Sequence, residues 1–207
     1  MTDTKWIPLE SNPTVWNEYA MQLGMTNDYE FVDVWSLDSA CIDFLNNPVC
    51  FILLFPSKPK IEDRTEPFTG YFIKQTVDNA CGTIALVHSL SELPLSVNSP
   101  LSNYISRTSN MTPKERASEL EAWKFLHEQH KANALSGQTD AVTADLDTNL
   151  HFVCIKKVGQ NVFEFDGRFS NPLKLGSDLV QSTRNRFETL MNDCPGDEFS
   201  ILALVSK

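Results

Sequence analysis

An unbroken run of apolar residues from Val49 to Phe55 constrains the fold more than any other part of this sequence. The run is much shorter than the roughly 18 apolar residues that cross a bilayer, and its length suits a strand better than a helix. A strand whose residues do not alternate between apolar and polar is buried on both faces. The run therefore predicts a central strand in a sheet that helices cover on both sides.

Other segments supply elements that fit around this strand. We predict helices over residues 13–23, 36–46, 79–90, 113–131 and 178–192, a shorter helix after Pro100, and further strands over 29–34, 71–73, 151–158, 162–166 and 199–205. Since a hairpin links some strands and helices link others, we expect an α/β fold of the α+β type. Its sheet is mixed and largely antiparallel. The chain has 207 residues, of which 42% are hydrophobic, and we expect it to form one domain over residues 1–207.

Residues 132–149 differ from the rest of the chain. They contain Asn, Ser, Gly, Thr and Asp and few large apolar side chains. A long loop without secondary structure is uncommon inside a compact domain and is usually functional or mobile. We therefore expect this loop to serve the function of the chain.

Charge and cysteine usage narrow the choice of partners and compartment. The net charge of −10 argues against nucleic acid and anionic membranes, which basic patches recognise. The five cysteines form no CxxC pair, and the N-terminus shows no basic stretch followed by an apolar one. We expect reduced thiols and a cytoplasmic location.

His127 and His130 do not form a His-Glu-x-x-His motif, so we interpret them as surface residues and expect neither metal nor cofactor.

The stretch from Gln75 to Thr83, QTVDNACGT, carries the clearest chemical signal. Cys81 falls in the first turn of a predicted helix, where unpaired N–H groups and the helix dipole stabilise a thiolate. Gly82 lets a substrate backbone approach closely. Gln75 and the backbone N–H of Cys81 are suitable donors to an oxyanion. This combination favours a nucleophilic cysteine over a buried structural one.

A thiolate nucleophile requires a base. His88 lies about 10 Å along the same predicted helix from Cys81, which is too far for a hydrogen bond. His151 instead begins a strand directly after the polar loop, and Asp166 ends the next strand. If the two strands form a hairpin, Asp166 can orient His151 towards Cys81. An Asp-Gly pair can also be only a turn, and the hairpin geometry favours the catalytic interpretation.

Three separated motifs resemble those of the ubiquitin C-terminal hydrolases, a family of cysteine peptidases. They are the stretch from Gln75 to Ile84, Leu150-His151-Phe152, and Phe165-Asp166-Gly167-Arg168. The opening stretch from Trp6 to Pro13 and the stretch from Phe31 to Val34 match the same pattern, so the resemblance covers essentially the whole chain. It points to the short members that consist of the catalytic domain alone.

The resemblance implies a deubiquitinating thiol hydrolase that acts through a thioester. It assigns Cys81 as nucleophile, His151 as base, Asp166 as its orienting partner and Gln75 as oxyanion donor. It also implies a knotted backbone, an exception to the rule against threaded chains, and a crossover loop over the active site at residues 132–149. Such a loop limits substrates to small or unfolded adducts.

Partners follow from the same resemblance. Ubiquitin is the expected partner, with NEDD8 as a second candidate, and the enzyme is expected to be a monomer. Glu10 and Asp33 match positions that line an acidic groove for the ubiquitin tail, whereas Thr14 stands where relatives often carry an acidic residue.

Two alternatives remain open at the level of sequence. A papain-like protease shares the Gln-to-Cys spacing, but its Cys-Gly-Ser/Ala-Cys signature is absent from Cys81-Gly82-Thr83-Ile84. A ubiquitin-binding module without turnover would have the same fold. The presence of all four candidate catalytic residues favours an enzyme over such a module.

Overall fold

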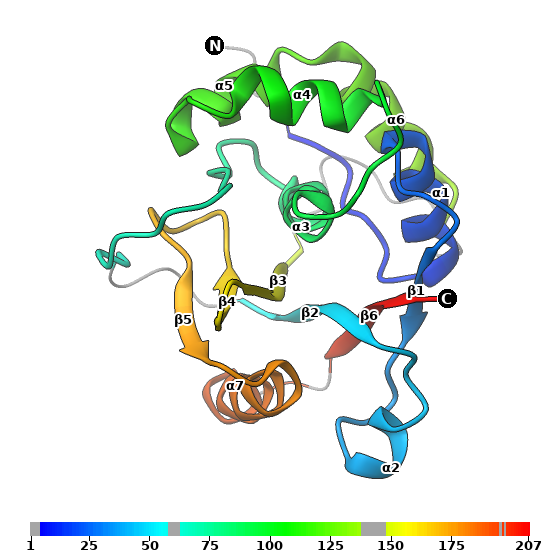
Figure 1. Cartoon of the computed structure of the whole chain (residues 1–207), viewed down its shortest axis with the longest axis vertical. Helices are drawn as coiled ribbons and strands as arrows, with labels where there is room; N and C mark the ends of the chain where they lie inside the picture. Colours follow the sequence, from blue (N-terminus) through cyan, green and yellow to red (C-terminus); the bar gives the residue numbers. More distant parts are fainter. Residues whose placement is uncertain (1–4, 58–62, 138–147, 195, 197) are drawn as a thin grey trace.

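A computed structural model describes residues 5–57, 63–137, 148–194, 196 and 198–207. Along the chain (Figure 1), the elements are α1 (Pro13–Leu23), β1 (Tyr29–Asp33), α2 (Ser39–Ile42), β2 (Pro48–Pro56), α3 (Cys81–Leu90), α4 (Pro100–Thr108), α5 (Pro113–Glu121), α6 (Lys124–Leu135), β3 (Leu150–Val158), β4 (Asn161–Phe165), β5 (Leu173–Gly176), α7 (Leu179–Asp193) and β6 (Ser200–Ser206). The ends of α1 follow the sequence signals, whereas the helix predicted from Asn79 begins at Cys81 without a side-chain cap. Asn12 caps α1 through the N–H of Thr14, and Gly24 ends it with φ of 118°.

The strands form one six-stranded sheet in the order β1-β6-β2-β3-β4-β5, and every pair is antiparallel. The strand β2 lies inside the sheet between β6 and β3, with Leu53 opposite Val153 on one side and Ile201 on the other. Phe51 and Leu53 are completely buried. The apolar run of the sequence is therefore a central strand, as predicted.

Helices cover both faces of this sheet. Alternate residues of β2 divide between two core clusters, so that Ile52 packs with α1 and α3 while Phe51 and Leu53 pack on the side of α7. Figure 1 shows α3 and α1 on one side of the strands and α7 on the other. The α+β architecture predicted from the sequence is confirmed, although the described strands form an antiparallel sheet rather than a mixed one.

Several predicted boundaries are wrong in detail. The helix expected over 113–131 is divided between α5 and α6, because Trp123 leaves the helical conformation and its ring stacks on Tyr104 with centroids 4.9 Å apart. The helix expected over 36–46 is reduced to the single turn of α2. Residues 71–73 are buried but join no strand, and β5 was not predicted.

The predicted crossover loop is described only at its ends. The α6 helix continues to Leu135, so the first residues of the 132–149 segment are helical rather than looped. Residues 138–147 lie outside the described part of the chain. The crossover over the active site and the knot therefore stay predictions. Among the helices that the structure describes, none is long and apolar enough to cross a membrane.

Candidate active site

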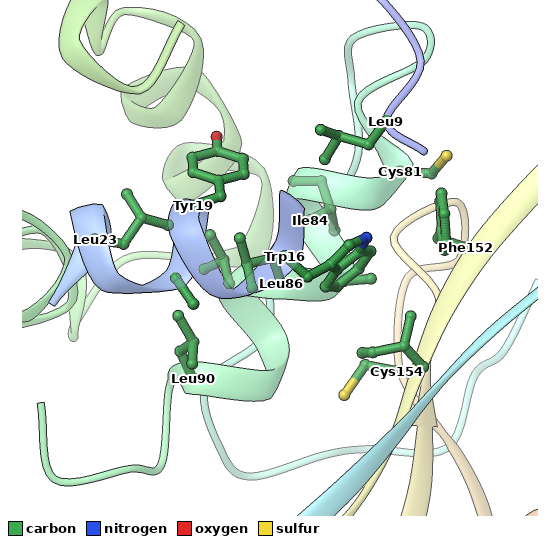
Figure 2. Packing of buried hydrophobic residues seen from close by; sticks show 14 of the residues in the cluster. Leu9, Trp16, Tyr19, Leu23, Cys81, Ile84, Leu86, Leu90, Phe152 and Cys154 are labelled. Atoms are coloured by element: carbon green, nitrogen blue, oxygen red, sulfur yellow. The ribbon is translucent and has the colours of Figure 1, made fainter. Parts of the chain in front are cut away.

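Cys81 is the first residue of α3, and its side chain sits at the edge of the core. The N-terminal segment crosses this helix end, where the backbone N–H of Trp6 donates to the carbonyl of Asp78 at 3.0 Å. Leu9 packs directly on Gly82, since a Cβ there would lie 2.9 Å from Leu9 Cδ1. Figure 2 shows Cys81 at the end of α3, near Leu9 and Phe152. Any side chain at position 82 would therefore displace Leu9 from the end of α3.

The surroundings of Cys81 favour its thiolate. Burial raises the pKa of the thiol, but the hydrogen bond and positive charge of His151 lower it, together with backbone N–H groups of Phe152 and Gly82. The net effect places the pKa of Cys81 below the usual thiol value. The helix N-terminus acts in the same direction. The site can therefore hold an ionised sulfur nucleophile.

His151 lies in β3, with its ring between Cys81 and Asp166. Its Nε2 is 2.9 Å from Asp166 Oδ1, and both side chains are buried. Burial lowers the pKa of His151, but hydrogen bonds and charges from Asp166 and Cys81 outweigh it and raise the pKa to about 9. These shifts favour the protonated imidazole and the thiolate of Cys81 as partners.

Asp166 directly follows β4, and the β3–β4 hairpin brings it to His151 as the sequence predicted. Phe165 pairs with Cys154 in this hairpin, which fixes Asp166 just beyond the paired residues. Burial raises the pKa of Asp166, but hydrogen bonds and charges from His151 and Arg168 hold it far below its ordinary value. The carboxylate stays ionised and fixes one nitrogen of the imidazole.

Gln75 is held beside this hairpin by its backbone. Its N–H donates to the carbonyl of Gly167 at 2.8 Å. Gly167 directly follows Asp166, so this bond holds Gln75 beside the Asp166 end of the hairpin. The side-chain Nε2 donates to the Val77 carbonyl at 3.1 Å, while Oε1 is buried without a hydrogen-bond partner among the described residues. Within the described part of the chain, the second Nε2 hydrogen has no acceptor. The oxyanion role of Gln75 stays a prediction.

Cys81 opens into a narrow cleft of about 200 Å³. The cleft is lined by Pro8, Leu9, Glu10, Ser11, Leu54, Cys81, Ala134, Thr148, Leu150 and Phe152. The predicted binding residue Glu10 thus lies near the nucleophile, whereas Asp33 lines a separate cleft of about 430 Å³ beside α7. The hydroxyls of Ser11 and Ser200, which belong to the first and second cleft, are 2.7 Å apart. The two clefts therefore adjoin.

The structure corrects the interpretation of His130 and supports that of His88. His130 is buried rather than exposed, with Nδ1 2.8 Å from the Thr83 hydroxyl and Nε2 2.7 Å from the Ile7 carbonyl. It fastens the N-terminal segment to α3, a role that a lone histidine in a helix does not reveal. His88 accepts a hydrogen bond from the Ile73 backbone and takes no part in the Cys81 site. No group of metal-binding side chains occurs among the described residues.

Arg168 stands in one of the motifs, and the sequence alone does not reveal its role. Its guanidinium contacts both carboxylate oxygens of Asp166, with Nη2 to Oδ2 at 2.7 Å. An Asp-x-Arg spacing at the end of a strand is a usable signal for such a contact, because a turn brings the two side chains together.

A buried cysteine at a helix N-terminus, paired with histidine and aspartate, defines a thiol hydrolase. The model of the family described as ubiquitin carboxyl-terminal hydrolase, family 1, matches residues 6–192. The chain belongs to this family of cysteine-type hydrolases.

Relatives with this name resemble the chain over most of its length. Ubiquitin carboxyl-terminal hydrolase 3 of Arabidopsis thaliana is 35% identical over 222 aligned positions, which cover 97% of this chain and 94% of the relative. Isozyme L1 of Homo sapiens is 32% identical over 186 positions and covers 82% of each chain. The catalytic domain of Trichinella spiralis UCH37, solved with ubiquitin vinyl methyl ester, superposes with a TM-score of 0.83 at 24% identity. It covers 98% of this chain and 95% of that one, which shows the same fold.

Proposed function

We propose that this chain releases small or unfolded adducts from the C-terminal glycine of ubiquitin, with Cys81, His151, Asp166 and Gln75 as its catalytic residues. The observation that carries this proposal is the chain of contacts from Asp166 through His151 to Cys81, which in turn lines a cleft. Membership of the family and the ubiquitin-derived ligand of the Trichinella relative support the choice of substrate. We also propose that the enzyme is a cytoplasmic monomer.

In the proposed reaction, the Cys81 thiolate attacks the carbonyl carbon of the terminal glycine. The resulting oxyanion accepts hydrogen bonds from the Cys81 backbone N–H and from Gln75 Nε2. The His151 imidazolium gives its proton to the leaving amine, which departs and leaves a thioester. Neutral His151 then takes a proton from water, and the hydroxide displaces the Cys81 thiolate and releases the free carboxylate. Asp166 keeps the imidazole oriented in both steps.

The form of the cleft supports a limit on substrate size. Ala134 and Thr148 stand on either side of the 138–147 segment, and both line the cleft of Cys81. Near the same place, a Cβ at Gly137 would lie 2.4 Å from Glu10 Oε2. We therefore propose that the crossover predicted for residues 132–149 excludes folded leaving groups. Glu10 gives this opening a negative charge suited to a basic C-terminal tail.

The test is hydrolysis of a C-terminal fluorogenic amide of ubiquitin, beside the same amide of NEDD8 and beside di-ubiquitin. We expect turnover of the ubiquitin amide, loss of turnover with retained binding in Cys81→Ala, and poor cleavage of di-ubiquitin. Binding without turnover by the natural chain would instead identify a ubiquitin-binding module.

The size limit has its own control. Inserting about ten Gly/Ser residues after Gly137 should improve cleavage of di-ubiquitin relative to the amide, because doubling a flexible loop costs only about 0.6 kcal/mol of closure entropy. If the natural enzyme cleaves di-ubiquitin as readily as the small amide, the 132–149 segment is not a size filter.

A further inference from the structure

We propose that Arg168 is a positioning residue that sets the proton affinity of His151 by sharing the carboxylate of Asp166. The inference rests on the proposed function only in assigning His151 as acid and base. Its evidence is the geometry of the guanidinium between two anchors.

The first anchor is the carboxylate itself. Arg168 Nε lies 3.1 Å from both Oδ1 and Oδ2 of Asp166, and Nη2 lies 2.7 Å from Oδ2. The Arg168 backbone N–H also donates to Oδ1 at 3.0 Å. His151 Nε2 shares this same Oδ1 at 2.9 Å. Arg168 therefore fixes the rotation of the carboxylate and competes with His151 for its charge.

The second anchor ties Arg168 to the strand that carries His151. Arg168 Nη1 donates to the Ser57 hydroxyl, just beyond the end of β2. The Ser57 backbone N–H donates to the Asn149 carbonyl at 2.6 Å, two residues before His151. One guanidinium thus joins the ends of β2 and β4 to the start of β3. A shift of Asp166, or of the segment that leads into β3, would therefore disturb the contacts of Arg168.

Other charged groups near Asp166 are less suited to this role. Arg186 reaches towards it from α7, but its guanidinium is bonded to the buried carboxylate of Glu164. His88 faces it from α3, and burial lowers the pKa of His88 to about 3, so that this ring is neutral. On its other side, His151 faces Cys81. Among these groups, Arg168 is the cation that contacts the Asp166 carboxylate directly.

The electrostatic consequence has a definite sign. A cation on the carboxylate offsets part of the negative charge that stabilises the imidazolium, and it also repels the imidazolium directly. Arg168 should therefore hold the proton affinity of His151 below the value that Asp166 and Cys81 alone would impose. A moderate affinity suits a group that first donates a proton to the leaving amine and then accepts one from water.

The experiment compares Arg168→Gln with Arg168→Lys and with Arg107→Gln. Arg107 is a half-exposed residue of α4 paired with Glu119, so its substitution changes the net charge equally at a distance from the site. The readouts are the titration of the His151 ring by NMR, which needs no turnover, and the pH profile of kcat/KM with the ubiquitin amide. We expect Arg168→Gln to move the His151 midpoint and the alkaline limb upward by about one pH unit. Arg168→Lys and Arg107→Gln should keep both near their natural positions.

Two results would overturn the inference. The first is a His151 midpoint that does not change in Arg168→Gln. The second is a shift of the midpoint in Arg168→Lys as large as in Arg168→Gln, because such a shift would come from packing rather than from charge. If Arg168→Gln does not fold, Arg168→Met takes its place in the same comparison, because it keeps the aliphatic stem and removes the charge. Absence of turnover in the natural protein would instead refute the proposed function and leave the NMR comparison valid.

Discussion

Replacing Gly167 with alanine probes the proposed oxyanion site without touching a catalytic side chain. A Cβ at position 167 would lie 2.9 Å from Gln75 Cβ, 3.0 Å from Gln75 N and 3.0 Å from Ile84 Cγ2. Ordinary contacts begin at 3.4 Å, so relief requires a displacement of about 0.5 Å (3.4 − 2.9) at Gln75. The Gln75 backbone cannot retreat freely, because its N–H is bonded to the Gly167 carbonyl at 2.8 Å.

A shift of this size is enough to disturb catalysis. Productive geometry tolerates about 0.5 Å, and the loss of one oxyanion donor costs about 10² to 10³ in kcat. We therefore expect Gly167→Ala to lower kcat on the order of 10²-fold, close to the effect of Gln75→Ala, with a small change in KM. Overpacking should also lower the free energy of unfolding by about 1–3 kcal/mol.

The assay is steady-state hydrolysis of the ubiquitin amide together with thermal unfolding. Gly176→Ala is a matched control, because its Cβ would meet the movable Ser182 hydroxyl at 2.7 Å, in a strand that forms no part of the Cys81 cleft. The control should lose stability and keep its kcat. A Gly167→Ala enzyme that loses stability but retains kcat within about twofold would refute the placement of Gln75 in the oxyanion site.

Three further predictions follow from the site. His151→Ala should lower kcat on the order of 10³-fold or more, and Asp166→Asn should lower it less, since Asp166 orients and stabilises the base but transfers no proton itself. Equal losses in the amide assay would contradict this division. Glu10→Ala and Asp33→Ala should raise KM at low salt, with a penalty that shrinks as salt is added, and unchanged kinetics would mark both carboxylates as solvated surface. The pKa of His151 rises from 6.5 to about 9 on folding, so about 3 kcal/mol of stability is present below pH 6.5 and is lost towards pH 9. Denaturant unfolding below and above this window should show the loss, and His151→Ala should not.

Apolar patterning was sufficient to predict the layers of the fold. The uninterrupted run from Val49 to Phe55 has to be buried on both faces, and the structure places it inside the sheet. The hairpin was predictable from the Gly159-Gln160 turn between two predicted strands, and the structure gives Gly159 a φ of 59° there. That hairpin then brings Asp166 to His151, so local signals led to a contact between distant residues.

Features that depend on tertiary contacts could not be predicted from apolar patterning or turn residues. The helix break at Trp123 depends on stacking with Tyr104, while the apolar stripe around it continues unbroken. The strand β5 is four residues long, pairs with β4 alone and exposes Leu173, so it lacks the alternation of a buried strand. The burial of His130 depends on the hydroxyl of Thr83, far away in sequence.

The most direct test of the central claim is covalent trapping with ubiquitin vinyl methyl ester, followed by intact-mass measurement and peptide mapping. We expect one ubiquitin per chain, attached to Cys81, while the thiols of Cys41, Cys50, Cys154 and Cys194 remain free. Cys81→Ala should give no adduct under the same conditions. An adduct on another cysteine, or a natural chain that binds ubiquitin and forms no adduct, would contradict Cys81 as the nucleophile.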